Sequence, residues 1–205
     1  MSGLFVTLEG GDGVGKTTQA QLLTAWVEGL GRTVVRTREP GGTALGLTLR
    51  ELLLHTEGPV DPRAEALLYA ADRAQHVAEV VRPALARGDL VLQDRYIDSS
   101  LAYQGAGRTL GDGDVRGLSE WATGALWPDL TILLDLDPAT AAVRRASGRG
   151  EADRLEAEKL DFHERVRDEF LALAAAEPER FLVLDAAGSV DEIQAAIRDR
   201  LTPLL

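Results

Sequence analysis

The sequence predicts an α/β fold of three layers, α/β/α, in which a five-stranded parallel sheet lies between two layers of helices. Three observations predict it. Short β-prone apolar runs alternate along the chain with longer segments of helical period, which is typical of parallel strands joined by helices. The apolar runs are nearly continuous, as expected of strands that are buried on both faces. A glycine-rich segment joins the first apolar run to the first helical segment.

The elements follow one another in a regular order. The expected strands cover residues 4–8, 33–37, 90–92, 130–136 and 181–184. The helical segments cover residues 16–30, 45–54, 63–87, 113–123, 138–146, 157–176 and 190–201. Stretches rich in glycine, proline or charge, expected to be loops or lids, cover residues 57–62, 105–113 and 146–154. Because the length suits one ordinary domain and no repeat interrupts it, we expect a single domain over residues 1–205.

Composition and charge exclude several classes of function. The chain is 45% hydrophobic and 27% charged, which is typical of a soluble globular protein. No apolar run approaches the roughly 20 residues of a membrane span, and no secretory signal is visible, so we expect a cytoplasmic protein without a membrane partner. The net charge of −11 argues against a nucleic-acid polymer as partner. The absence of cysteine excludes disulfides and thiolate metal sites.

The glycine-rich segment has the spacing of a phosphate-binding loop, or P-loop. Gly10, Gly15, Lys16 and Thr17 match the pattern Gly-x-x-x-x-Gly-Lys-Thr between an expected strand and an expected helix. Glycines let backbone N–H groups turn toward phosphate oxygens, and the helix points its positive N-terminus at the same anion. We expect Lys16 to reach the β- and γ-phosphates of a nucleoside triphosphate, and Thr17 to hold Mg²⁺. The residues expected to bind this nucleotide are Gly10, Gly11, Asp12, Gly13, Val14, Gly15, Lys16, Thr17 and Thr18.

Charged residues follow four of the expected strands, at the edge where parallel sheets bind ligands. They are Glu9, Arg38, Glu39, Asp94, Arg95 and Asp135. An aspartate such as Asp94, at the end of a core strand beside a P-loop, commonly holds Mg²⁺ through water. Arg95 is suited to clamp a second phosphate; the alternative is a salt bridge at the strand end.

The helical segment over residues 63–87 divides into an apolar and a polar face. The apolar stripe consists of Leu67, Ala70, Ala71, Ala74, Val77, Ala78, Val81 and Leu85. Tyr69, Arg73 and His76 are expected on the opposite face, away from the core. An aromatic ring beside an arginine suits stacking on a base and hydrogen bonding to its edge. An exposed tyrosine with a cation–π neighbour is an equal alternative on these residues alone.

Arginines gather near the end of the segment 138–146 and in the loop beyond it. They are Arg144, Arg145, Arg149 and Arg154. An arginine-bearing loop near a P-loop can stabilise charge on a transferred phosphoryl group and exclude water; a solvated basic patch is the alternative. His55 and His163 have no partner pattern and are expected to be surface or packing residues.

These motifs together resemble those of the bacterial thymidylate kinase family over essentially the whole chain. The matching segments are residues 5–18, Thr37-Arg-Glu-Pro-Gly-Gly-Thr43, Leu68-Tyr-Ala-Ala-Asp-Arg73, Asp94-Arg-Tyr-Ile-Asp-Ser-Ser-Leu-Ala-Tyr-Gln-Gly105, and Gly150-Glu-Ala-Asp-Arg-Leu-Glu156. The resemblance implies a P-loop NTPase fold with an arginine-bearing lid at about residues 144–156. It also implies a homodimer that transfers the γ-phosphoryl group of ATP to dTMP with Mg²⁺, giving dTDP and ADP.

The resemblance also implies roles for individual residues. At the phosphates, Asp12 would meet the sugar 3′-OH of dTMP, Glu9 would lie close to the metal, and Arg50 and Arg95 would contact the dTMP phosphate. In the acceptor pocket, Arg38 and Glu39 would lie at the border, Tyr69 would stack on thymine and Arg73 would bond the thymine edge. The base pocket would be completed by Ser99, Ser100 and Gln104. Tyr103 would pack beneath the deoxyribose and disfavour a ribose.

Two features depart from the family pattern. The P-loop stretch Gly11-Asp-Gly-Val14 contains no basic residue, so the catalytic arginine is expected from the lid, as Arg145 or Arg149. Gln93 occupies a strand position that the family normally keeps apolar, and the sequence gives no account of it. Two other functions stay open at this point: a kinase for another nucleoside or nucleotide, and a nucleotide-dependent switch. A guanine-reading Asn-Lys-x-Asp element is absent from the chain.

Overall fold

The computed structural model describes residues 3–146 and 153–205, and it confirms the predicted three-layer fold. The strands are β1 (Leu4–Glu9), β2 (Val34–Arg38), β3 (Leu90–Asp94), β4 (Leu130–Asp135) and β5 (Phe181–Asp185). They form one five-stranded sheet in the order β2-β3-β1-β4-β5, in which every adjacent pair is parallel. The P-loop strand β1 is therefore central, and the charged residues that follow the strands meet at one edge.

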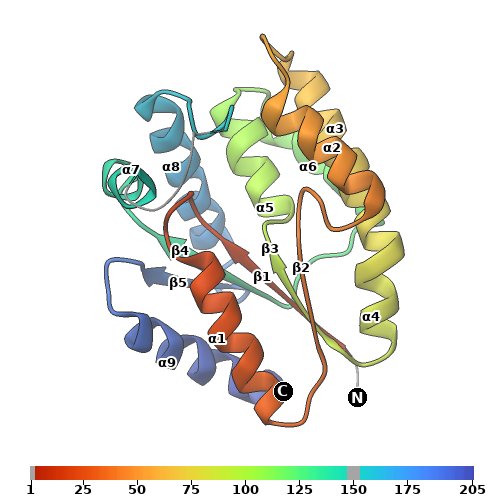
Figure 1. Cartoon of the computed structure of the whole chain (residues 1–205), viewed down its shortest axis with the longest axis vertical. Coiled ribbons are helices and arrows are strands. Elements are labelled where there is room, and N and C mark those ends of the chain that lie inside the picture. The colour runs from red at the N-terminus through yellow and green to blue at the C-terminus, as the bar shows by residue number, and fades with distance from the viewer. Residues whose placement is uncertain (1–2, 147–152) are drawn as a thin grey trace.

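Helices cover both faces of the sheet (Figure 1). One face packs on α1 (Lys16–Gly29) and α9 (Val190–Leu201), through a core that includes Val6, Leu23 and Ile197. The elements of the other face are α2 (Ala44–His55), α3 (Pro62–His76), η1 (Val77–Val81), α4 (Arg82–Ala86), α5 (Ile97–Ser100), η2 (Leu101–Gly107), α6 (Asp112–Thr123) and α8 (Leu160–Ala176). α7 (Pro138–Ala146) follows β4, and a short 3₁₀ turn (Thr202–Leu204) ends the chain.

Local sequence accounts for where several helices begin. Thr43 caps α2 by accepting a hydrogen bond from Gly46 N–H, and Asp61 caps α3 just before Pro62 at its first position. Ser189 and Glu192 form a complete capping box at the start of α9. Within residues 3–146 and 153–205, none of the helices has the length and apolarity needed to cross a membrane.

The expected loop over residues 105–113 is partly helical. Residues 97–107 form α5 and the π-helical turn η2, which the sequence analysis did not predict. Gly107 looks like a loop residue in the sequence, but a side chain there would meet the ring of Phe162 at 2.6 Å. The glycine therefore permits close packing of η2 on α8, and it does not mark a turn.

The predicted faces of the segment 63–87 were wrong in part, because Ala70, Val77 and Val81 are buried as expected but the polar side is buried too. Its intended core stripe is partly exposed: 58% of Leu67 is accessible, and Ala71 and Ala78 are exposed. Tyr69 and Arg73 are 9% and 2% exposed and His76 is fully buried. A periodic pattern assumes that the buried side is the apolar one, whereas here the polar side is buried because its groups pair with distant segments.

Candidate active site

A cavity of about 390 Å³ lies at the carboxyl edge of the sheet. The predicted site residues that line it are Asp12, Gly13, Gly15, Lys16, Thr17, Thr18, Arg38, Glu39, Arg50, Tyr69, Arg73, Asp94, Arg95, Ser99, Ser100, Tyr103, Gln104 and Arg145. The fold thus brings the P-loop, the strand ends and one face of α3 to the same place. Leu54 of α2 and Tyr96 also line the cavity, although no motif singled them out for a role. Arg149 lies outside the described residues.

The P-loop backbone requires glycine at two positions that touch neighbouring elements. Gly10 and Gly13 have φ values of 124° and 84°. A side chain at Gly10 would meet the Leu134 carbonyl oxygen at 2.4 Å, and one at Gly13 would meet the Ala141 carbonyl oxygen at 2.8 Å. The loop is thereby pressed against β4 and α7, while Val14 is buried in the core. Its backbone shape depends on these glycines as well as on the ligand pattern.

Lys16 lies buried at the start of α1, inside the P-loop. Its Nζ donates hydrogen bonds to the carbonyl oxygens of Gly10 and Gly11, at 3.0 and 2.6 Å. Burial lowers the pKa of Lys16, Arg95 lowers it further, and Asp94 and Asp12 act in the opposite direction. An anionic phosphate in this loop would supply the compensating charge that a buried ammonium lacks.

Arg95 reaches from the end of β3 across the cavity to the P-loop. Its guanidinium donates to Asp12 Oδ1 at 2.7 Å, to the Gly10 carbonyl at 3.1 Å and to Ser99 Oγ at 3.3 Å, and it lies 4.9 Å from the ring centre of Tyr103. Burial alone would raise the pKa of Asp12, but Arg95 and Lys16 hold it well below its usual value. Two cations and one carboxylate therefore meet where two phosphates would approach each other.

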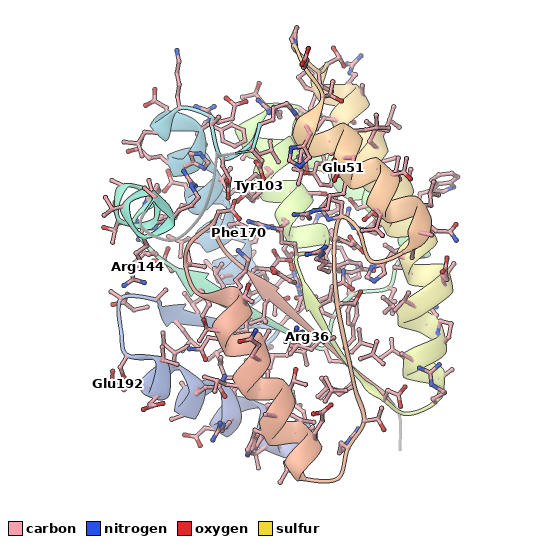
Figure 2. All side chains as sticks on the ribbon, in the orientation of Figure 1. Arg36, Glu51, Tyr103, Arg144, Phe170 and Glu192 are labelled. Carbon is pink, nitrogen blue, oxygen red and sulfur yellow. The ribbon has the colours of Figure 1, made fainter. Side chains whose placement is uncertain are left out.

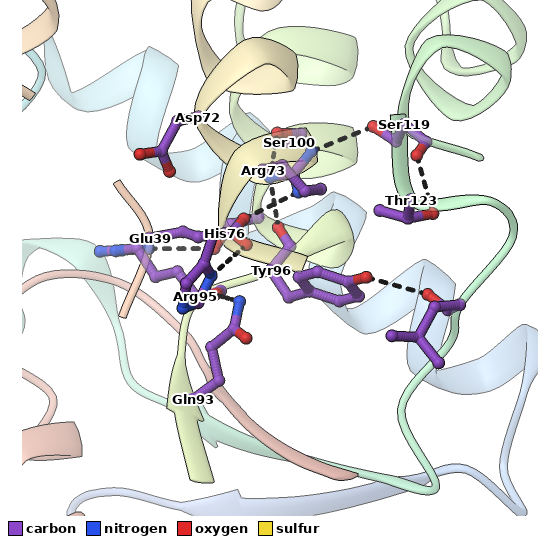
Figure 3. A network of polar contacts seen from close by, with 12 residues as sticks. Glu39, Asp72, Arg73, His76, Gln93, Arg95, Tyr96, Ser100, Ser119 and Thr123 are labelled. Carbon is purple, nitrogen blue, oxygen red and sulfur yellow. Dashed lines mark hydrogen bonds and ion pairs between the residues drawn. The ribbon is translucent and has the colours of Figure 1, made fainter. Parts of the chain in front are cut away.

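The structure gives Gln93 a partner that explains its place in β3. Arg95 has a φ of 67°, in the left-handed region that residues other than glycine rarely adopt. Gln93 Nε2 donates to the backbone carbonyl of Arg95 at 2.9 Å (Figure 3), and the Arg95 N–H donates to the Leu8 carbonyl at 3.0 Å. The buried amide therefore helps to hold the strained backbone from which the Arg95 side chain starts.

Among the predicted metal ligands, Asp94 and Thr17 line the cavity and Glu9 does not. Asp94 Oδ1 is buried without a hydrogen-bond partner among the described residues, so this oxygen is suited to bind a hydrated cation. Both oxygens of Glu9 accept hydrogen bonds, from the Tyr96 N–H at 2.7 Å and the Ser99 hydroxyl at 2.5 Å. Burial, together with Asp98, raises the pKa of Glu9 to about 7. Glu9 is fully buried and holds the segment after β3, and its place close to the metal stays a prediction.

The Arg73 guanidinium is held by four residues from three segments of the chain (Figure 3). Its Nε donates to Glu39 Oε2 at 2.8 Å and its Nη1 to Ser119 Oγ at 3.1 Å. Its Nη2 donates to the Tyr96 carbonyl and to Ser100 Oγ, at 3.1 and 2.9 Å. Four of its five N–H groups thus have acceptors among the described residues. Ser119, on α6, has no sequence signal for this role.

Gln104 and Arg154 meet at one buried carboxylate. Gln104 Nε2 donates to Glu65 Oε1 at 2.9 Å, and Arg154 forms an ion pair with Glu65 Oε2 at 2.7 Å. Arg154 also donates to the Leu53 carbonyl at 2.9 Å. Arg154, expected in the lid, therefore ties the end of that segment to α2 and α3. Arg145 donates to the Glu156 carbonyl at 3.2 Å and lines the cavity.

Asp135 was predicted at the rim of the active site, and it lies outside the lining of the main cavity. Its two oxygens accept hydrogen bonds from Arg167 of α8 at 2.7 and 2.8 Å. It lines a smaller cavity of about 150 Å³ between α7 and α8. The position after β4 is at the expected edge of the sheet, but the nearest cation draws the side chain away.

The carboxyl group of Asp72 predicts a pH dependence of stability. Its Oδ1 accepts a hydrogen bond from Gly41 N–H at 3.1 Å, and its Oδ2 is buried without a partner among the described residues. Burial, and then nearby Glu39, raise the pKa of Asp72 to about 6. Between about pH 4 and about pH 6 the folded protein therefore keeps a proton that the unfolded chain releases, so this group's contribution to stability falls as pH rises.

We expect Asp72→Asn to remove that loss. The quantity to compare is the free energy of unfolding of the variant minus that of the unsubstituted protein. This difference should be larger at about pH 8 than at about pH 4, by on the order of 1–3 kcal/mol. Urea unfolding at both pH values measures the difference. An equal difference at the two pH values would show that Asp72 titrates normally.

Comparison with known proteins agrees with this geometry. A family model described as thymidylate kinase matches residues 8–197. A thymidylate kinase of Leifsonia xyli is 68% identical over 199 residues, which cover 97% of this chain and 94% of that protein. One of Clavibacter michiganensis is 64% identical over 205 residues, covering 100% and 97%. The crystal structure of thymidylate kinase from Ehrlichia chaffeensis superimposes with a TM-score of 0.80 at 30% identity, covering 98% of this chain and 99% of that one. The chain therefore belongs to the thymidylate kinase family, which consists of nucleoside monophosphate kinases.

Proposed function

We propose that this chain transfers the γ-phosphoryl group of ATP to dTMP, giving dTDP and ADP in the biosynthesis of dTTP. The observation that supports the proposal is that the P-loop, Arg95 and the buried Tyr69 of α3 line one cavity. A switch protein needs the P-loop but has no use for a second anion site. Detection of dTDP after incubation with Mg·ATP and dTMP tests the proposal, and its absence would reject it.

On the donor side, the P-loop from Gly10 to Thr18 would hold the ATP phosphates. Lys16 would exchange its hydrogen bonds to the Gly10 and Gly11 carbonyls for bonds to the β- and γ-phosphates. The N-terminus of α1 directs its partial positive charge at the same group. The buried ammonium supports this role, because hydrogen bonds to anionic phosphate oxygens are stronger than the present ones to neutral carbonyl oxygens.

On the acceptor side, Arg95 and Arg50 would bind the dTMP phosphate, and Tyr69 would stack on thymine. Both arginines line the cavity, with Arg50 fixed by a hydrogen bond from Nη1 to the Pro40 carbonyl at 3.0 Å. Tyr69 is nine-tenths buried, so its ring already has a fixed orientation. Asp12, held by Arg95, would meet the 3′-OH and couple the two phosphate sites.

Catalysis would rest on alignment and charge neutralisation. A phosphate monoester oxygen is already a competent nucleophile, so no strong base is needed. Lys16 and Arg95 would hold the two anions together despite their repulsion. When bound, Mg²⁺ would neutralise the β- and γ-phosphates; Thr17 and Asp94 are the residues suited to hold it, in part through water.

The chain would form one domain over residues 1–205, with a lid at about residues 144–156. The catalytic arginine would come from this lid. Arg145 lines the cavity and so supports one assignment, and Arg149 is the other. Alanine substitution of each in turn tests them: the catalytic one should lower kcat by about 10³-fold or more. Equal, small effects of both substitutions would reject both assignments.

Tyr103 should determine the preference for deoxyribose. Tyr103 is 5% exposed, and its ring lies edge-on against Phe162 and Phe170 and would fill the space of a 2′-OH. Tyr103→Ala should lower the kcat/KM ratio of dTMP to ribothymidine monophosphate by about 1–2 kcal/mol, or roughly tenfold. Tyr103→Phe keeps the ring and should keep the ratio. A ratio unchanged in the alanine variant would remove this role.

A homodimer is supported by an apolar surface over α2, α3 and α6. Leu67 is 58% and Trp121 84% exposed, and Leu47 and Leu52 of α2 are also exposed. These helices pack side by side on one flank of the molecule (Figure 1). Large exposed apolar groups on adjacent helices are typical of a surface that another chain covers. Light scattering should give twice the mass of the chain, and Leu67→Asp should shift it toward the monomer; a monomeric unsubstituted protein would reject the dimer.

A further inference from the structure

His76 has no place in the reaction described so far, although it is fully buried next to the acceptor pocket. It ends α3, one turn after Arg73, and it does not line the cavity. A polar ring that is completely removed from water is stable only if its nitrogen atoms have partners.

Both ring nitrogens have partners, and these partners indicate the tautomer of the ring. Nδ1 lies 2.8 Å from Glu39 Oε1, and Nε2 lies 2.7 Å from Thr37 Oγ1 (Figure 3 shows the Glu39 contact). Because a carboxylate oxygen only accepts, we assign the proton to Nδ1, which donates to Glu39. In the neutral ring, Nε2 then accepts the hydrogen bond of the Thr37 hydroxyl.

The ring also fixes the backbone that carries Glu39. A side chain at Gly42 would lie 2.5 Å from Cδ2 and Nε2 of His76, so the loop from β2 to α2 closes directly on the ring edge. Thr37, Glu39 and Gly42 thus contact His76 at three points within six residues of chain. His76 holds this loop against the last turn of α3.

Glu39 passes this constraint to Arg73. Its Oε1 accepts from His76 and its Oε2 accepts from Arg73 Nε, each at 2.8 Å, so each oxygen serves one partner. Glu39 and Arg73 are both almost fully buried, and both line the cavity. Without the His76 donor, the carboxylate could turn about its terminal bond, and the plane of the guanidinium would lose one of its supports.

We propose that His76 is a positioning residue that, through Glu39, orients Arg73 for recognition of the acceptor base. It sets affinity for the acceptor nucleotide and leaves the transfer step and the ATP site largely unaffected. The inference rests on the proposed function, because it assumes that Arg73 faces the base of dTMP.

The test separates the two ends of the imidazole. His76→Leu removes both hydrogen bonds, His76→Asn keeps an amide N–H near the position of Nδ1, and His76→Gln keeps one near Nε2. Thr37→Val removes only the Thr37 partner. For each folded variant, kcat and KM are measured for dTMP at saturating ATP and for ATP at saturating dTMP, with circular dichroism as the check on folding.

His76→Leu and His76→Gln should raise the KM for dTMP by about tenfold or more, as expected for a lost hydrogen bond to a charged group, with kcat and the KM for ATP changed less than about threefold. His76→Asn and Thr37→Val should stay within about threefold of the unsubstituted KM for dTMP. If His76→Leu does not fold, the comparison of Asn with Gln decides in the same way.

Either of two KM results would overturn the proposal: an unchanged KM for dTMP in the Leu and Gln variants, or an Asn variant as impaired as Gln. A parallel fall in kcat for every variant would also overturn it, because that indicates general disruption. If the unsubstituted protein does not phosphorylate dTMP, the proposed function itself fails, which the first assay shows before any variant is made.

Discussion

Replacing Arg95 with alanine should lower kcat/KM for dTMP by at least about 2 kcal/mol, or roughly 30-fold. Arg95 is the cation that would grip the acceptor phosphate, and it also donates to Asp12, to the Gly10 carbonyl and to Ser99. The substitution removes these bonds together with the clamp. Steady-state kinetics with dTMP as the varied substrate give the value.

Arg36→Ala is the matched control for this experiment. Arg36 lies exposed on the edge strand β2 (Figure 2), outside the cavity lining. It should leave kcat/KM within about twofold. Arg95→Lys keeps the charge without the planar fork and should recover only part of the loss. Kinetics of Arg95→Ala that match those of Arg36→Ala would exclude a role for Arg95 at the phosphate.

Arg180→Ala should destabilise the protein by about 3–5 kcal/mol, because it leaves a buried carboxylate unpaired. Arg180 contacts both oxygens of the fully buried Asp98, at 2.6 and 2.9 Å, and donates to Thr131 Oγ1 at 2.8 Å. The guanidinium also lies 5.0 Å from the ring centre of Trp127. Asp98 belongs to α5, which also carries Ser99 and Ser100. Urea unfolding measures the change.

An ion pair whose arginine is exposed provides the comparison. Arg87 is 59% exposed and pairs with Asp89 at 2.8 Å, so Arg87→Ala should cost less than about 1 kcal/mol. Adding Asp98→Asn to Arg180→Ala should recover part of the loss, since it removes the unpaired charge. If Arg180→Ala costs no more than Arg87→Ala, the buried pair is not an anchor for α5.

The fold could be predicted because its determinants are local. Four of the five strands are short, mostly apolar runs, β2 at the edge (Val-Val-Arg-Thr-Arg) being the exception, and the pattern from Gly10 to Thr17 specifies a loop between a strand and a helix. The segment 97–107 could not be predicted in the same way. Its helical turns are stabilised by burial of Tyr103 against Phe162 and Phe170, which are distant in sequence.

Positions at the site could be predicted better than side-chain directions. The order of the strands places Glu9 and Asp135 at the carboxyl edge, as expected, but each turns toward a partner that the sequence does not reveal, Ser99 and Arg167 respectively. The faces of α3 were assigned wrongly for the same reason. Arg73 and His76 are buried because Glu39, far along the chain, neutralises Arg73 and accepts a hydrogen bond from each of them.

The reaction itself is tested most directly by ADP release from Mg·ATP with purified protein, across dTMP, dUMP, dCMP, dAMP, dGMP, thymidine and no acceptor. The account predicts strong turnover with dTMP, weak turnover with dUMP and negligible turnover with the others. Preference for another acceptor would indicate a kinase with a different base pocket. Turnover without any acceptor, or none with dTMP, would contradict the account and leave only a nucleotide-binding P-loop.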